Sequence, residues 1–292
     1  MTTLIATDLD RTMIYSRSAM ELAAGEKDVT DPAAQDDLLC VEVYDGKPLS
    51  YVTTAAESML RRLADTTVVV PTTTRTVAQF QRIELPGAPW RYAITTNGGN
   101  ILVDGVPDEG WRSDVDAAIA AGAASLSEIG DELARRVDDS WVRSSRIADE
   151  LFSYLVVDVD AMPTGFVEDW DAWCSDRGWG ASRQGRKVYT MPKAVCKSRA
   201  VAEVRARLVK DGVLEQGTSV LAAGDGALDA AMLSKADAAI RPRHGELEAL
   251  DWQHPSVAVT DSSGIAAGEE ILRWFWDRVE CGAGSTPAAS PL

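Results

Sequence analysis

Short apolar runs that end in polar side chains and alternate with helical patterns constrain the fold of this chain more than any other feature. Residues 4–9 form such a run, and acidic side chains stand at its end. Continuous apolar runs of this length are typical of strands buried on both faces of a sheet. Their alternation with helices predicts a parallel α/β sheet. Similar runs stand at residues 67–70, 92–95, 219–223, 236–240 and 257–259, with helical patterns at 53–64, 76–83, 197–209, 227–234 and 265–279.

The middle of the chain has a different rhythm. A long helical pattern at 114–137 precedes two strand-like runs, and a second helix followed by two runs repeats this order. Such a repeat predicts a small antiparallel sheet with helices on one face. The fold class is therefore expected to be α/β, a doubly wound and mostly parallel core sheet with an inserted αββαββ cap. The expected boundaries are 1–99 and 192–281 for the core domain, 100–191 for the cap domain and 282–292 for a loose C-terminal tail.

An excursion separates the first strand from the first long helix. Residues 16–39 are acidic and rich in small side chains, and they read as irregular structure. Alternating apolar residues then stand on both sides of Asp45-Gly46. An Asp-Gly pair between alternating runs predicts a β-hairpin at 40–52.

The net charge of −16 limits the classes of partner. An acidic surface repels the phosphates of nucleic acids and of anionic membranes, so we expect neither as a partner. The sequence shows no leader peptide and no run long enough to span a membrane, and the four cysteines are widely spaced, so a reducing cytoplasm is the expected location. A small anionic substrate is compatible if its site carries local positive charge. Nothing in the sequence specifies an oligomeric state.

Two carboxylates follow the first predicted strand. Asp8 and Asp10 stand at its carboxyl end, which is where ligands bind in open α/β sheets. Such a pair suits a bound cation and acid–base chemistry. A solvated turn or a helix cap, however, explains an isolated Asp-x-Asp more readily.

Two further polar residues stand at a strand end and a helix start. Thr73 follows the second predicted strand, and its hydroxyl could donate to a phosphoryl oxygen, although threonine is also a common helix N-cap. Lys197 begins a predicted helix, where the helix dipole disfavours a cation. This position indicates that the charge of Lys197 is needed there, with an ordinary surface lysine as the alternative.

Gly224-Asp225-Gly226 follows the predicted strand at 219–223 and puts a carboxylate at the same sheet edge as Asp8. Asp229 stands four residues after Asp225, close to one helical turn away. A glycine-rich loop of a dinucleotide-binding oxidoreductase is a rival interpretation. Its GxGxxG spacing is absent, and the loop does not follow the first strand, so this interpretation is disfavoured.

In combination these signals resemble the haloacid-dehalogenase (HAD) phosphatases with a large α/β cap, the group that contains Cof-type sugar phosphatases, sucrose-phosphate phosphatase and mannosyl-3-phosphoglycerate phosphatase. The resemblance covers roughly residues 1–280. Arg11 and Thr74 stand where that family usually has glycine, and the segment 16–52 is longer than usual. The matching residues are Asp8, Asp10 and Thr12 of the first motif, Thr73 of the second, Lys197 of the third, Gly224, Asp225, Gly226 and Asp229 of the fourth, and Asn97-Gly98 in the turn before the cap.

This resemblance implies a Mg²⁺-dependent phosphatase that acts on a small phosphorylated metabolite such as a sugar phosphate. It implies that Asp8 is the nucleophile, that Asp10 is the general acid–base, and that Thr73 and Lys197 bind phosphoryl oxygens. The further implied roles are magnesium binding by the carboxylates of Asp8 and Asp225 and the backbone carbonyl of Asp10, and orientation of Lys197 or a metal-bound water by Asp229.

The cap would select the substrate. A phosphomutase of the same superfamily and a metabolite-binding protein without catalytic activity are the alternatives, although the second would be expected to have lost one of the catalytic residues. The candidate substrate-binding residues are Thr12, Asn97, Gly98, Arg143, Arg146, Arg183 and Arg186.

Overall fold

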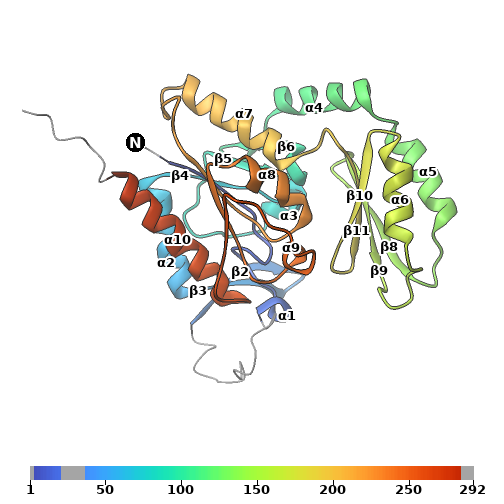
Figure 1. Cartoon of the computed structure of the whole chain (residues 1–292), viewed down its shortest axis with the longest axis horizontal. Coiled ribbons are helices and arrows are strands. Elements are labelled where there is room, and N and C mark those ends of the chain that lie inside the picture. The colour runs from blue at the N-terminus through green and yellow to red at the C-terminus, as the bar shows by residue number, and fades with distance from the viewer. Residues whose placement is uncertain (1–2, 21–36, 284–292) are drawn as a thin grey trace, which may run out of the picture.

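The computed structural model describes residues 3–20 and 37–283 of the chain. Its core is a five-stranded parallel sheet with the strand order β14-β13-β12-β1-β4 (Figure 1). This sheet confirms the predicted α/β class. The strands are β1 (Leu4–Thr7), β4 (Val68–Pro71), β12 (Val220–Ala223), β13 (Ala238–Arg241) and β14 (Val257–Val259).

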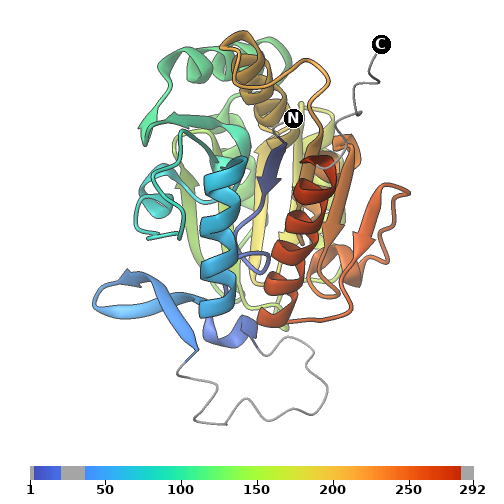
Figure 2. The same cartoon turned by 90° about the vertical axis from the view of Figure 1, so that its left-hand side faces the viewer.

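Helices cover both faces of this sheet because successive residues of β1 point to opposite faces. Ile5 is buried in one apolar cluster with Leu60 of α2 and Ile271 of α10, and these two helices lie side by side over the sheet (Figure 2). Ala6 is buried in a second cluster with Leu233 of α8. Full burial of an Ile or Leu side chain contributes about 1.5–3 kcal/mol. The helices are α2 (Thr54–Thr66), α7 (Lys197–Lys210), α8 (Ala230–Lys235) and α10 (Ile265–Ala283).

A three-stranded antiparallel sheet continues from the edge at β4. β5 (Tyr92–Thr95) pairs with β6 (Asn100–Val103), and β6 pairs with β7 (Val106–Pro107). A single bridge between Thr72 and Ile94 joins β5 to the end of β4. The run predicted as a further core strand thus lies beside β4 but pairs mainly with β6, so the expected boundary at 99–100 falls inside a hairpin.

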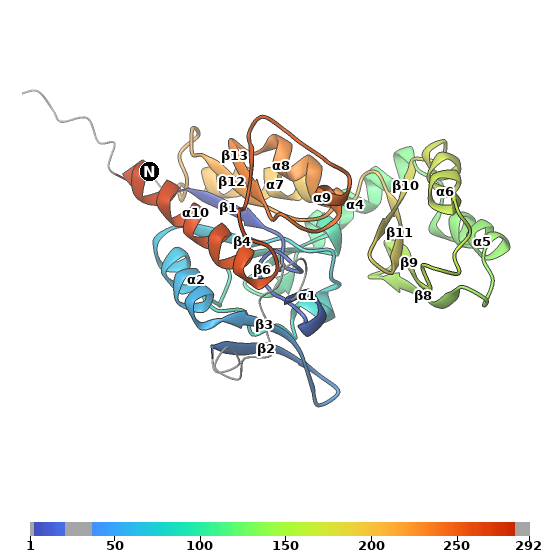
Figure 3. The same cartoon turned by 60° about the horizontal axis from the view of Figure 1, so that its bottom comes forward.

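The predicted second sheet is present, with the strand order β10-β11-β9-β8 and with α5 and α6 on one face, and it stands apart from the core sheet (Figures 1 and 3). The expectation of one long helix at 114–137 is wrong, because two helices occupy this region. Ser125 ends the first by capping the second, accepting a bond from the Glu128 amide at 3.1 Å. The elements are α4 (Glu109–Gly122), α5 (Leu126–Arg136), β8 (Val142–Ala148), β9 (Phe152–Val157), α6 (Phe166–Ser175), β10 (Trp179–Gln184) and β11 (Lys187–Pro192).

The hairpin is confirmed as β2 (Leu38–Tyr44) and β3 (Lys47–Thr53), with Asp45 and Gly46 both at positive φ in its turn. The helix expected at 76–83 is limited to α3 (Val77–Phe80), because Ile83 forms a β-bridge with Glu42 of the hairpin. Two short helices were not predicted, α1 (Arg17–Met20) and α9 (Glu246–Ala249). Residues 21–36 of the excursion and 284–292 of the expected tail lie outside the described residues, whereas 282–283 belong to α10.

Candidate active site

Asp8 follows β1 at the carboxyl end of the sheet and is 4% exposed. Lys197, the first residue of α7, is equally buried, and its Nζ donates to Asp8 Oδ1 and to Asp229 Oδ1, both at 2.6 Å. Asp229 also accepts the Gly226 amide on its other oxygen at 2.9 Å. Asp8 is therefore held in place at the point where β1 lies between β12 and β4, the position at which open α/β sheets bind ligands.

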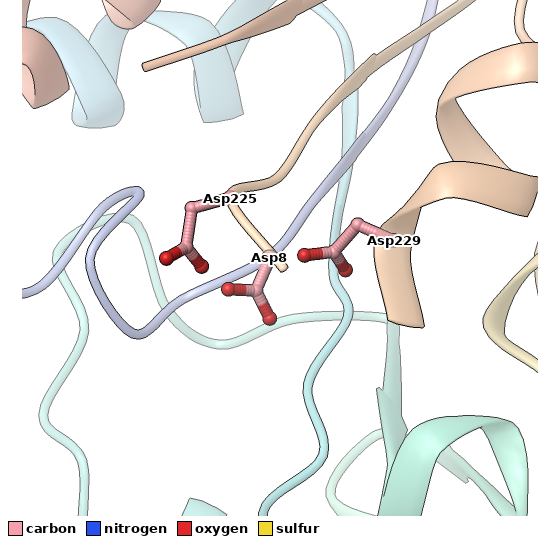
Figure 4. A group of neighbouring side chains, drawn as sticks. All are labelled: Asp8, Asp225 and Asp229. Carbon is pink, nitrogen blue, oxygen red and sulfur yellow. The ribbon is translucent and has the colours of Figure 1, made fainter. Parts of the chain in front are cut away.

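A cation site can be formed beside this pair. Carboxylate oxygens of Asp8, Asp225 and Asp229 all lie within 4.8 Å of one another, and the three side chains converge in Figure 4. Both carboxylate oxygens of Asp225 are buried without a hydrogen-bond partner among the described residues. Buried polar atoms without partners are rare, and hard oxygen ligands suit Mg²⁺ or Ca²⁺. These residues therefore fit a divalent cation.

The protonation of the site reflects its excess of negative charge. Burial raises the pKa of Asp8 to about 7; Lys197 opposes this shift, and the charge of Asp229 adds to it. Burial also raises the pKa of Asp225 well above its usual value, and the charges of Asp8 and Asp229 reinforce the shift. Burial acts to lower the pKa of Lys197, but the two carboxylates outweigh it and raise the value. The ammonium group of Lys197 thus bonds to two of the three carboxylates and leaves Asp225 without a bonded cation, and a bound metal ion would relieve this imbalance.

Asp10 is separate from this cluster. Its two oxygens accept a bidentate pair of bonds from Arg75 at 2.7 and 2.8 Å. Arg75 also donates to Glu42 at 2.7 Å, and Glu42 is buried on β2 with a bond from Ser50. Desolvation acts to raise the pKa of Asp10, but the bonds and charge of Arg75 outweigh it and lower the value. The hairpin therefore fixes Arg75, and Arg75 fixes Asp10 in its ionised form.

The remaining residues expected in the core motifs are buried. Thr12 is fully buried, and its Oγ1 donates to Asp8 at 3.5 Å. Thr73 is also fully buried and accepts the Arg75 amide at 3.1 Å. Asn97 donates to the carbonyl oxygen of Val195 at 3.2 Å, and Gly98 lies so close to the backbone of residues 196–197 that a Cβ would be 2.5 Å from the Cys196 oxygen. Asn97 and Gly98 thus hold the segment that begins α7 and carries Lys197.

A cleft of about 500 Å³ leads to Asp8 and Asp10, and side chains of both sheets line it. Of the cap arginines expected to bind substrate, only Arg186 is among the lining residues that the structure describes. Arg143 pairs with Asp158 at 2.6 Å, Arg146 is exposed on β8, and Arg183 donates to the Gly185 carbonyl at 2.9 Å.

Sequence reasoning missed several lining or supporting residues. No local signal links Glu42 to Arg75, because they are 33 positions apart and meet only when the hairpin folds. Gly245 has a φ of +87°, and a Cβ there would be 2.4 Å from Asp225 Oδ2. The residues that sequence reasoning did not assign to the site are Arg11, Glu42, Arg75, Tyr189 and Gly245.

Comparison with known proteins identifies the fold. No protein-family model and no curated protein sequence matches the chain. The sucrose-phosphatase of Synechocystis sp. PCC6803, solved with sucrose and phosphate, matches with a TM-score of 0.64 and 14% identity over 96% of this chain and 99% of that one. The chain has the HAD fold. A HAD subclass IIB sugar phosphatase matches with a TM-score of 0.54 and 11% identity over 94% of this chain and 99% of that one.

A third solved structure, a trehalose-6-phosphate phosphatase related protein, matches this HAD-fold chain with a TM-score of 0.51 and 17% identity, over 97% of this chain and 100% of that one. At sequence identities this low, the structural matches show a shared fold, and this fold extends over nearly the whole length of each protein. The expected resemblance to capped HAD phosphatases is therefore confirmed at the level of the fold. No helix among residues 3–20 and 37–283 combines the length and apolar character that a membrane crossing requires.

Proposed function

We propose that this chain is a Mg²⁺-dependent phosphatase that hydrolyses the phosphate monoester of a small metabolite, such as a sugar phosphate. The observation that carries the proposal is the buried Asp8, which Lys197 holds at 2.6 Å beside the unpartnered oxygens of Asp225. Acidic nucleophiles with an adjacent cation site are suited to attack a dianionic phosphate. The likeness in fold to a sucrose-phosphatase and a sugar phosphatase supports the substrate class.

In this proposal Asp8 attacks phosphorus and forms an aspartyl-phosphate, which water then hydrolyses. Lys197 and Thr73 bind the transferring phosphoryl oxygens, and Lys197 also offsets charge that develops during transfer. Asp10 donates a proton to the leaving oxygen and then accepts one from the attacking water. Because Arg75 holds Asp10 ionised, Asp10 has to take up its proton when the dianionic substrate enters and raises its pKa.

Magnesium would be held by the carboxylates of Asp8 and Asp225 and the backbone carbonyl of Asp10, and it supplies positive charge between the nucleophile and the phosphate. Asp229 orients Lys197, to which its carboxylate already bonds. We also propose that residues 1–99 and 192–281 form the catalytic core and that 100–191 act as a cap over the cleft. Phosphate release from a panel of phosphorylated metabolites, with isomerised products measured in parallel, tests this function and separates it from mutase activity.

Metal dependence should follow the protonation of the site. Because their pKa values are raised, the carboxyl groups of Asp8 and Asp225 hold protons below pH 7, and Mg²⁺ has to displace these protons. We therefore expect Mg²⁺ to raise the melting temperature more at pH 8 than at pH 5.

Phosphatase activity should be abolished by EDTA and restored by Mg²⁺, with Ca²⁺ a poor substitute because its larger coordination shell would displace Asp8. Equal stabilisation at both pH values, or full activity in EDTA, would contradict the assignment.

Gly245 should control the position of Asp225. The alanine methyl of Gly245→Ala would overlap Asp225 Oδ2 and displace this carboxylate. We expect Mg²⁺ binding to weaken by about 10–100-fold, the usual effect of disturbing a residue that positions a metal ligand. Gly105→Ala is the matched control, because Gly105 has a similar φ of +81° but open space around its Cβ position. Calorimetric Mg²⁺ titration checks this. Equal affinities for the two variants would mean that Gly245 does not position the carboxylate.

A further inference from the structure

Among residues 3–20 and 37–283, three cationic side chains line the cleft without a carboxylate partner. Arg11 comes from the loop after β1, and Arg186 and Lys187 come from the β10–β11 turn and the start of β11. None of the three forms an ion pair within the described part of the chain. The other cations that line the cleft are all paired with carboxylates: Lys197, Arg75 and Arg82.

Arg11 and Lys187 are close to each other, and Arg186 belongs to the turn that Arg11 reaches. A terminal nitrogen of Arg11 lies 3.3 Å from the position that a Cβ on Gly185 would occupy, so its guanidinium reaches the turn that precedes Arg186. Lys187 Nζ lies 5.4 Å from the centre of the Tyr154 ring. Desolvation lowers the pKa of Lys187, Arg75 and Arg11 lower it further, and only Asp10 opposes them. Lys187 is therefore within electrostatic reach of Arg11 and of the proposed acid–base residue.

The backbone conformation at Arg11 is unfavourable for a residue that has a side chain. Its φ is +61°, a conformation that glycine adopts freely and that costs other residues roughly 1–2 kcal/mol. The chain as a whole has a net charge of −16, so unpaired cations gathered in one cleft are not a general property of its surface. Their mutual repulsion disfavours the empty cleft and is relieved when an anion binds.

The transferred phosphoryl group does not use these cations in the proposed function. Its charge would be met by Lys197 and by a divalent cation beside Asp8. Asp10 is bonded to Arg75, and its charge interacts with both Lys187 and Lys197. In the mechanism above, Asp10 faces the leaving oxygen, so Lys187 lies on the leaving-group side, together with the turn at Gly185 that Arg11 reaches.

We propose that the substrate carries a second anionic group, a carboxylate or a second phosphate, on its leaving group, and that Arg11, Arg186 and Lys187 bind it. This inference rests on the proposed phosphatase function and specifies its substrate class. A cleft of about 500 Å³ is the size of a typical small-molecule site and can hold a phosphorylated sugar acid or a sugar bisphosphate. Polar side chains suited to sugar hydroxyls also line it: Ser16, Ser50, Thr76, Gln79 and Gln184.

Matched pairs of phosphate esters test the proposal. Glucose 6-phosphate is compared with 6-phosphogluconate, and fructose 6-phosphate with fructose 1,6-bisphosphate. We expect kcat/KM for the member with the second anion to be higher by about tenfold or more in at least one pair, which is about 1.4 kcal/mol of selective binding. The pair that responds identifies the second group as a carboxylate or as a phosphate.

Arg11→Gly is the most informative variant, because it removes a charge and relieves backbone strain at the same time. It should unfold at an equal or higher temperature, yet the preference for the second anion should fall by about tenfold. Lys187→Met should reduce the preference in the same way. Arg146→Gln is the control, since it removes an arginine of the same sheet that lies outside the cleft, and it should keep the full preference.

Two results would overturn the inference while leaving the phosphatase function intact. One is equal kcat/KM within both pairs, and the other is a preference that survives in both Arg11→Gly and Lys187→Met. If no ester, including p-nitrophenyl phosphate, releases phosphate, the proposed function is wrong. Calorimetric binding of 6-phosphogluconate against glucose 6-phosphate, and of fructose 1,6-bisphosphate against fructose 6-phosphate, then still decides whether the cleft recognises the second anion.

Discussion

Replacing Lys197 by methionine is expected to destabilise the metal-free protein by about 3–5 kcal/mol, the usual consequence of removing one partner from a buried ion pair. The Lys197 ammonium is 1% exposed and bonds to both Asp8 and Asp229 at 2.6 Å. Without it, these two carboxylates and Asp225 remain buried with no cation. Their ionisation would then have to be suppressed, or the segment around them would have to open.

The pH dependence of this loss has a definite sign. The pKa of Asp8 is already raised in the folded state, so its ionisation costs stability as the pH rises from about 4 towards 7. Removal of Lys197 should raise the pKa further and make the variant relatively less stable at pH 8 than at pH 5. Mg²⁺ should restore part of the lost stability at pH 8, because it supplies positive charge to the same carboxylates, but phosphatase activity should stay near background.

Chemical denaturation of Lys197→Met with and without Mg²⁺ checks this expectation. Lys210→Met is the matched control, since Lys210 is an exposed lysine at the other end of the same helix. It should change the free energy of unfolding by no more than about 0.5 kcal/mol, as most surface substitutions do. A loss of stability in Lys197→Met no larger than that of the control would show that the buried charges are compensated by other means.

The second large effect concerns the two acidic residues of the first motif. Asp8→Asn removes the proposed nucleophile, and turnover should fall to background. Asp10→Asn removes the general acid–base but leaves Asp8, Lys197 and the cation site in place, so turnover should fall by about 10²–10⁴-fold. The loss of kcat/KM in Asp10→Asn, which reports the phosphorylation step, should be smaller for an aryl phosphate, whose leaving oxygen needs no proton, than for a sugar phosphate. A uniform loss for both substrates would argue against proton transfer by Asp10.

The parts of the fold and site that sequence analysis predicted depend on simple geometry. Apolar runs alternating with helices specify a parallel sheet, and the carboxyl ends of its strands meet at one edge. Asp8 and Asp225 follow neighbouring strands, β1 and β12, and for that reason their convergence could be predicted from two separated motifs. The position of Lys197 at a helix N-terminus, which is unfavourable for a cation, indicated only that its charge is needed there, and its place in the site was implied by the resemblance to the HAD phosphatases.

The parts that were missed depend on contacts between distant segments. The break between α4 and α5 follows from the cap at Ser125 and from a bond between the Ala124 amide and the Arg177 carbonyl, which periodicity does not reveal. Glu42 is a charged residue in an apolar strand pattern, and only the folded hairpin shows that Arg75 and Arg82 are its partners. The antiparallel pairing of β5 requires the reversal at Asn97-Gly98, where both residues have positive φ.

Mass spectrometry of the phosphorylated protein tests the central claim most directly. The Asp10→Asn and Asp8→Asn variants are mixed with Mg²⁺ and an activated aryl phosphate, quenched in acid and digested. We expect a phosphoryl group on residue 8 of Asp10→Asn, because the nucleophile is intact and hydrolysis of the intermediate is slow, and none on Asp8→Asn. An unlabelled Asp10→Asn protein that binds Mg²⁺ normally, or near-normal turnover by Asp8→Asn, would contradict the assignment of Asp8 as the nucleophile.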